Sequence, residues 1–346
     1  IMFKNFPQTR YQGSKYKLLP FLYEHISKLQ FNSALDLFSG TSSVSYLFKS
    51  LNKQVYSNDF MPFNAQISKS FIENNSITLS NDDILFLLNK HSHISYQNFI
   101  SQTFKDCYYL DAENEWLDVT VQNILALENP YKKALAFWAI YQSCLIKRPY
   151  NLFHRKNLHI RTADVKRSFG NKTTWDKPFD LCFKKFIQEA NNVVFDNHQN
   201  NLSLSLDACS LNYEQYPIDL VYIDPPYIPK QGSITTYSDF YHFLNGLTDY
   251  HHWHQKINYQ SKNFSFHKKY SIWEDKKNIF SGFQSIFKNF QPSTLVISYR
   301  NDGIPGIDDI ITELHKYYSN ISTQSLNHQY VLSSKKTQEI LIIAKN

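Results

Sequence analysis

Apolar side chains recur at both helical and strand spacing within the first sixty residues. They fall on one face of a helix over residues 18–29 and again over 44–51. The runs 33–41 and 53–59 are short and apolar instead, as in strands buried within a sheet. The order of strand, glycine-containing turn, helix and strand predicts one βαβ half of a nucleoside-binding sheet.

The rest of the chain predicts a long helical stretch followed by a return to strands. The apolar spacing is mostly helical from 63 to about 143, most clearly over 132–145, and a further helix is expected over 179–191. Strands are expected at 192–195, 203–207, 218–223, 294–299 and 338–344.

These elements predict an α/β fold with two insertions. We expect a catalytic sheet domain formed by 1–62 and 192–346, with helices on both faces of the sheet. A mainly helical region, 63–191, interrupts it, and a second insertion at about 228–270 is rich in tyrosine, histidine and lysine. A chain of 346 residues can hold one large domain or two.

Asp224-Pro225-Pro226-Tyr227 directly follows the apolar run 218–223. It is therefore expected at the carboxyl end of a buried strand, where open α/β sheets bind their ligands. The prolines stiffen the loop and supply no N–H groups, Asp224 offers a hydrogen-bond acceptor, and Tyr227 offers a stacking face. These groups suit the planar amino group of a base turned out of its stack. The alternative is an ordinary Pro-Pro turn beside a solvated aspartate.

The turn Asp36-Leu37-Phe38-Ser39-Gly40-Thr41 predicts a site for a ligand with an amino-acid tail and a nucleoside. Gly40 allows close approach of the backbone, and N–H groups at the helix start can bind a carboxylate. Asp36 can hold a cationic amine. Asp59, after the next strand, stands where an acid usually binds ribose hydroxyls.

Positive charge is concentrated between residues 147 and 177. This segment holds nine lysines and arginines against two aspartates, a net charge of +7, whereas the whole chain carries +6. Aromatic residues interleave with these charges, which favours binding to nucleic acid over the alternative of a solvated face. The candidate DNA-binding residues are Lys147, Arg148, Tyr150, Arg155, Lys156, Arg161, Lys166 and Arg167.

Other features restrict the class of protein. The four cysteines form no CxxC pair and the N-terminus has no signal-like pattern, so we expect a reduced, cytoplasmic protein. No apolar run reaches the roughly 18 residues that a membrane span needs. The histidines at 251, 252 and 254 are expected in aromatic packing or DNA contact rather than as metal ligands, because neighbouring histidines rarely converge on one ion.

Taken in order, these motifs resemble the Dam-like, alpha-group N6-adenine DNA methyltransferases. The resemblance runs from an N-terminal loop through the Asp36 turn and the Asp59 acid to the tetrapeptide at 224–227. It implies that S-adenosyl-L-methionine is the cofactor and that the acid at 207 caps the cofactor's adenine. The implied cofactor-binding residues are Tyr11, Gln12, Gly13, Ser14, Lys15, Asp36, Phe38, Ser39, Gly40, Thr41, Asp59, Phe60, Asp207 and Ala208, and the implied catalytic residues are Asp224, Pro225, Pro226 and Tyr227.

The resemblance also implies a function. Asp224 and the carbonyl of Pro225 would accept hydrogen bonds from N6 of an adenine flipped out of double-stranded DNA, and no metal would be required. Such enzymes protect DNA in bacterial restriction-modification systems. We expect this protein to be a monomer and to act separately from a possible cognate restriction endonuclease. One departure is Ser42, which replaces the second glycine of the family's turn and predicts a turn of different shape.

Two other functions remain open from the residues. One is an amino-methyltransferase that acts on rRNA, on cytosine N4 or on a protein glutamine, although the aspartate at 224 argues against the glutamine enzymes. The other is a catalytically silent DNA-binding subunit that uses the same fold as a scaffold. The intact tetrapeptide argues against a silent subunit.

Overall fold

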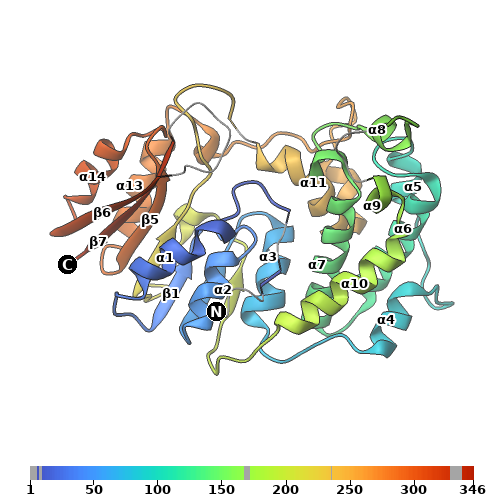
Figure 1. The fold of residues 1–346 in the computed structure, drawn as a ribbon, viewed down its shortest axis with the longest axis horizontal. Coiled ribbons are helices and arrows are strands. Elements are labelled where there is room, and N and C mark those ends of the chain that lie inside the picture. Colours follow the sequence, from blue (N-terminus) through green and yellow to red (C-terminus); the bar gives the residue numbers. More distant parts are fainter. Residues whose placement is uncertain (1–5, 8–9, 167–171, 235, 328–336) are drawn as a thin grey trace.

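A seven-stranded mixed sheet forms the centre of one half of the molecule (Figure 1). The computed structural model describes residues 6–7, 10–166, 172–234, 236–327 and 337–346. The strand order is β3-β2-β1-β4-β5-β7-β6, with β7 antiparallel to both neighbours and the first five strands parallel. The strands are β1 (Ser33–Asp36), β2 (Gln54–Asn58), β3 (Leu202–Leu204), β4 (Leu220–Ile223), β5 (Thr294–Arg300), β6 (Asn320–Asn327) and β7 (Gln338–Lys345).

Helices cover both faces of this sheet, as expected. Successive residues of β4 point to opposite faces, so Leu220 and Tyr222 join one apolar core while Val221 and Ile223 join the other. Helices α1 (Leu19–Ile26) and α2 (Ser43–Ser50) pack in the first core, and α13 (Ile279–Asn289) and α14 (Ile307–Leu314) pack in the second. The predicted α/β class is confirmed, with a Rossmann-like sheet. The strand order reverses between the paired strands β1 and β4. The loops that follow these two strands therefore run in opposite directions, which leaves a ligand-binding crevice at their carboxyl ends.

The second half of the molecule is helical and lies beside the sheet (Figure 1). The second insertion packs there too, since the Phe153 N–H donates to the Phe240 carbonyl and Tyr108 bonds the buried His242. The helices of this half are α3 (Pro62–Ser68), a π-helical turn (Lys69–Glu73), α4 (Asn81–Leu88), α5 (Phe99–Thr103), α6 (Asp111–Ala126), α7 (Pro130–Ile146), α8 (Leu158–Thr162), α9 (Lys172–Asp176), α10 (Phe179–Val193), α11 (Tyr237–Thr248) and α12 (Trp253–Lys256).

The structure corrects two expectations about strands. Residues 192–195 are not a strand, because α10 continues to Val193 and the chain then leaves regular structure. Strand β6 was not predicted, since its sequence is mostly polar. The start of the predicted insertion also packs on the sheet, where the Ser203 hydroxyl donates to the carbonyl of Ala65 in α3.

Two expectations concern absences. Within the described part of the chain, no group of three or more potential metal ligands comes together, and no helix is long and apolar enough to cross a membrane. The four cysteines, all described, are free, and Cys107, Cys144 and Cys182 are buried.

Candidate active site

One cavity of about 960 Å³ opens at the carboxyl edge of the parallel strands. Its volume is that of an ordinary small-ligand site. Every residue that the sequence suggested for catalysis or cofactor binding lines it, from the N-terminal loop, the ends of β1, β2 and β4 and the turn after β3. These are Tyr11, Gln12, Gly13, Ser14, Lys15, Asp36, Phe38, Ser39, Gly40, Thr41, Asp59, Phe60, Asp207, Ala208, Asp224, Pro225, Pro226 and Tyr227.

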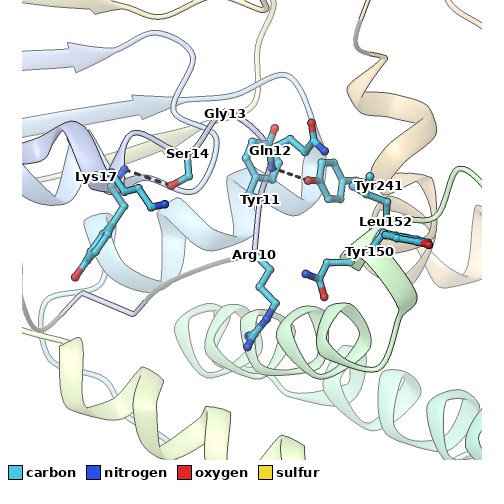
Figure 2. A pocket seen from close by; sticks show the side chains of 11 residues that line it. Arg10, Tyr11, Gln12, Gly13, Ser14, Lys17, Tyr150, Leu152 and Tyr241 are labelled. Carbon is cyan, nitrogen blue, oxygen red and sulfur yellow. Dashed lines mark hydrogen bonds between the residues drawn. The ribbon is translucent and has the colours of Figure 1, made fainter. Parts of the chain in front are cut away.

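The N-terminal loop is held against the second insertion. The Gln12 N–H donates to the Tyr241 hydroxyl at 2.9 Å, as Figure 2 shows, and the Tyr11 ring stacks on both Tyr237 and Tyr241. Gly13 has a φ of 76°, and a side chain there would come within 2.8 Å of the Tyr237 hydroxyl. The loop therefore needs glycine at this position.

Two residues of the turn after β1 have a left-handed backbone conformation. Gly40 has a φ of 52° and Ser42 a φ of 66°, both in the left-handed region. Ser42 takes up the left-handed conformation in spite of its side chain, and the expectation of a differently shaped turn stays a prediction. The buried Ser42 hydroxyl lies 3.0 Å from that of Ser68, which also contacts the hydroxyl of Ser57 at 3.0 Å.

Asp36 lies at the start of this turn, and only one of its two carboxylate oxygens accepts hydrogen bonds from described residues. Its Oδ2 accepts from the Ser45 N–H and hydroxyl, whereas its buried Oδ1 has no hydrogen-bond partner within the described part of the chain. Burial raises the pKa of Asp36 to about 7, against the opposing effect of Ser45. An unpartnered carboxylate oxygen in the wall of a cavity is suited to a cationic donor.

Asp59 ties the end of β2 to the same turn. Its Oδ2 accepts from the Gly40 N–H at 2.9 Å, and its Oδ1 accepts from the Met61 N–H and the Asn64 amide. Burial raises the pKa of Asp59. A carboxylate has about four acceptor positions, so one remains for a ligand hydroxyl.

Asp207 and Phe60 form the rim beside this acid. Asp207 is exposed and its Oδ1 accepts from the Cys209 N–H, which fixes the turn after β3. Phe60 is 67% exposed, so an apolar ring faces solvent beside the cavity.

The tetrapeptide after β4 faces both a cation and an acid. Lys15 Nζ lies 3.3 Å from Asp224 Oδ1 and 3.8 Å from Glu339 Oε1. Burial raises the pKa of Asp224 to about 6, Lys15 opposes this rise, and Glu339 adds to it. The Arg300 guanidinium lies over the Tyr227 ring, 4.4 Å from its centre, so a stacked base would use the other face of Tyr227.

Several residues of this cavity were not identified from the sequence. Arg300 is the last residue of β5, and it pairs with Glu339 near the start of the antiparallel strand β7. Trp273 also lines the cavity, and its ring packs edge-on against Phe38. No motif marks them, although their position at strand ends was a usable signal once the strands were placed.

The structure separates the candidate DNA-binding residues into two groups. Tyr150, Arg155, Lys156 and Lys166 are exposed, whereas Arg167 lies outside the described residues. Lys147, Arg148 and Arg161 are buried instead, so the expectation that they contact phosphates is wrong for this conformation. Lys147 and Arg161 pair with Glu113, and the Arg148 guanidinium stacks on Tyr108 and Phe153.

A second cavity of about 540 Å³ is lined in part by the same N-terminal loop. Arg10, Gln12, Tyr150 and Tyr241 line it, and Figure 2 shows Arg10 and Tyr150 below the hydrogen-bonded Gln12 and Tyr241. Tyr150 is 67% exposed and has a φ of 62°, so its ring is presented by an unusual backbone conformation. Among the exposed candidates, Tyr150 therefore lies beside the same cavity as the exposed Arg10 and Lys17.

The chain is similar to curated modification enzymes over most of its length. It is 26% identical to the type II methyltransferase M2.HphI of Haemophilus parahaemolyticus, with 99% of this chain and 98% of that protein aligned. It is 25% identical to the modification methylase StsI of Streptococcus sanguinis and 26% identical to the type II methyltransferase M.FokI of Planomicrobium okeanokoites. These alignments cover 89% and 85% of this chain but only 46% and 45% of those proteins. A family model matches residues 11–294, so the chain belongs to the D12 class of N6 adenine-specific DNA methyltransferases.

Proposed function

We propose that this protein transfers the methyl group of S-adenosyl-L-methionine to N6 of an adenine flipped out of duplex DNA. It acts at a specific sequence as the adenine-specific modification enzyme of a type II restriction-modification system. The observation that carries the proposal is the cavity itself, where the tetrapeptide 224–227 shares one space with the Asp36 and Asp59 carboxylates.

The residues of this cavity fit the cofactor. The unpartnered Oδ1 of Asp36 is a buried acceptor for the ammonium group of the amino-acid tail. Asp59 retains acceptor capacity for ribose hydroxyls, and the exposed Asp207 for the adenine amino group. S-adenosyl-L-methionine supplies an electrophilic methyl group when it is bound.

The chain's own contribution to the reaction is to orient and activate the target amine. The lone pair of adenine N6 is delocalised into the ring, so hydrogen bonds to the Asp224 carboxylate and the Pro225 carbonyl favour a more nucleophilic nitrogen in the transition state. The free face of Tyr227 stacks on the flipped base, which offsets part of the unstacking penalty of a few kcal/mol.

For the substrate, we propose that the helical region 63–191 and the insertion 228–270 together recognise the target sequence. The candidate residues are the exposed Tyr150, Arg155, Lys156 and Lys166, together with Arg10 and Lys17, which line the smaller cavity with Tyr150. We propose that the enzyme binds double-stranded DNA as a monomer and acts separately from a cognate endonuclease.

One experiment tests this function. The wild-type protein and Asp224→Ala are expressed in a bacterial host that lacks adenine methylation, and genomic DNA is analysed by modified-base sequencing and nucleoside mass spectrometry. We expect N6-methyladenine at one sequence motif with the wild type only, while Asp224→Ala binds S-adenosyl-L-methionine within about tenfold of the wild type. N4-methylcytosine instead would favour the cytosine alternative. Unmodified DNA despite folded protein would favour the silent subunit.

A further inference from the structure

Glu339 reaches the catalytic edge because of the strand topology. Strand β7 is antiparallel to β5, so the start of β7 lies where β5 ends, with Arg300 paired to Glu339. The carboxylate of Glu339 is thereby brought into the wall of the larger cavity, together with Asp224 and Lys15. Neither the tetrapeptide nor the N-terminal motif indicates a second acid here.

These three side chains form a compact charged group. Lys15 Nζ bridges Asp224 Oδ1 at 3.3 Å and Glu339 Oε1 at 3.8 Å, and the side chains are only 16%, 20% and 13% exposed respectively. The other oxygen of Glu339, Oε2, is buried and has no hydrogen-bond partner among the residues that the structure describes. Burial of an acid with an unpaired oxygen costs free energy. A role of the Glu339 charge would explain this cost.

We infer that Glu339 is a positioning residue, which holds the Lys15 ammonium between two carboxylates, so that Asp224 shares this cation and stays a stronger acceptor for the target amine than in a full ion pair with Lys15. The inference rests on the proposed function of Asp224. Lys15 acts on this carboxylate as a neighbouring cation, whereas Glu339 acts on it both as a neighbouring anion and through its contact with Lys15. In this arrangement the charge on Asp224 depends on residues from three separate parts of the chain.

The directions of the electrostatic effects follow from the charges around Asp224. Burial of Asp224 favours its neutral form, the Lys15 ammonium opposes this effect, and the Glu339 carboxylate adds to it. The other ionisable groups around this cluster, among the described residues, include Asp36 from β1, Tyr222 from β4, Tyr227 of the tetrapeptide, Arg300 from β5 and Tyr237 from α11. They are the same in all variants below, so only the Lys15 and Glu339 charges change.

Carboxyl ¹³C NMR titration of the protein without cofactor or DNA tests the inference directly. Asp224→Asn identifies the Asp224 resonance by its loss. We expect Lys15→Met to raise the pKa of Asp224 by about 1–3, since an adjacent opposite charge is lost. Glu339→Gln keeps an oxygen that can accept from Lys15 but removes a negative charge, so we expect a smaller decrease in this pKa. Lys15→Arg should stay near the wild-type value.

The pH dependence of kcat/KM for methyl transfer provides the second measurement, because it reports ionisations of the free enzyme. The acidic limb should move to higher pH in Lys15→Met and to lower pH in Glu339→Gln. At a pH below the limb, the rate should change about tenfold for each change of one in the pKa of Asp224. A purely structural role predicts lower activity at every pH with the limb unmoved.

The titration also defines the result that would contradict the inference. Unchanged Asp224 titration in Glu339→Gln, in protein with wild-type near-UV circular dichroism, would overturn it. Because the titration needs no turnover, its result stands even if the DNA substrate is wrong.

Discussion

Ser42 combines a backbone strain with a buried hydrogen bond. A left-handed conformation costs a residue with a side chain about 1–2 kcal/mol, and glycine avoids this cost. The Ser42 hydroxyl bonds that of Ser68, which is linked through Ser57 and Ser45 to the Asp36 carboxylate. The serine therefore connects the turn to the acid proposed to bind the cofactor amine, which a glycine could not do.

Substitution of Ser42 separates the two effects. Ser42→Ala keeps the strained backbone and loses the hydrogen bond, so we expect a loss of about 1 kcal/mol in the free energy of unfolding. Ser42→Gly loses the same bond but relieves the strain, and should be more stable than Ser42→Ala by about 1 kcal/mol. Urea unfolding followed by circular dichroism measures both. Equal stability of the two variants would mean that Ser42 is not left-handed in solution.

Asp59 is expected to contribute to cofactor affinity rather than to methyl transfer itself. Asp59→Ala removes an acceptor from the ribose hydroxyls, so we expect S-adenosyl-L-methionine binding to weaken by about 2 kcal/mol, roughly 30-fold. Isothermal titration calorimetry measures the change. Since Asp59 also accepts from the Gly40 N–H, the melting temperature is recorded in parallel. Asp82→Ala, an exposed acid in α4, is the matched control, and unchanged affinity in Asp59→Ala would move the ribose contact elsewhere.

At this scale, the sequence identified residues that occur in local motifs. Asp36 ends β1, and Asp59 and Asp224 directly follow β2 and β4, so their positions at one sheet edge follow from the strands alone. Glu339 has no such mark, since its role depends on the antiparallel pairing of β7 with β5. Sequence reasoning could not supply this pairing, because antiparallel register is set by contacts distant along the chain.

Among the elements, the 147–177 segment contains both buried cations, which bind other parts of the protein, and exposed cations, which are accessible to DNA. Arg161 donates to Glu113 at 2.9 Å and to the Trp175 carbonyl at 2.9 Å, which fixes α8 and α9 against α6. The charge count of the segment could not distinguish these buried cations from the exposed ones. Glu113, which pairs with Lys147 and Arg161, lies in a different helix, and nothing in the local sequence of the segment indicates this pairing.

Arg161→Met is therefore expected to reduce stability. The substitution leaves Glu113 with Lys147 as its remaining cation and leaves the Trp175 carbonyl without this donor, so we expect a loss of about 2 kcal/mol in the free energy of unfolding. Lys166→Met removes an exposed charge from the same segment and should change stability by less than about 0.5 kcal/mol. Chemical denaturation compares the two. A similar small effect for both would show that the Arg161 pair adds nothing to stability.

Elements with clear periodicity were predicted well, whereas those defined by tertiary contacts were not. Strand β4 is a continuous apolar run and was placed correctly, because it is buried on both faces. Strand β6 is a polar edge strand that forms only by pairing with β7, so its sequence carries no strand signal. The apolar residues Val193 and Val194 suggested a strand. Val193 instead completes the apolar face of α10, and Val194 is the capping residue directly after this helix.

For the whole molecule, the arrangement of charge matters more than the net charge of +6. The cations that remain exposed in 147–166 lie in the helical half, and the N-terminal loop adds Arg10 and Lys17 beside the second cavity. Duplex DNA bound across these residues would meet the loop that also borders the catalytic cavity. DNA affinity should therefore depend on a small set of cations and fall steeply with salt.

Measurement of DNA affinity over a series of salt concentrations tests this surface. Arg155→Ala, Lys156→Ala and Lys166→Ala should each flatten the log–log salt dependence by about 0.9 if the side chain meets a phosphate. A base-reading arginine behaves differently, since its loss costs about 1–3 kcal/mol on the cognate site and little on random duplex. Lys288→Ala, an exposed lysine of α13 on the sheet half, is the control for a simple loss of charge. If only Arg10→Ala and Lys17→Ala change the slope, the backbone follows the N-terminal loop. If none of these variants differs from the control, the recognition surface lies in the insertion 228–270.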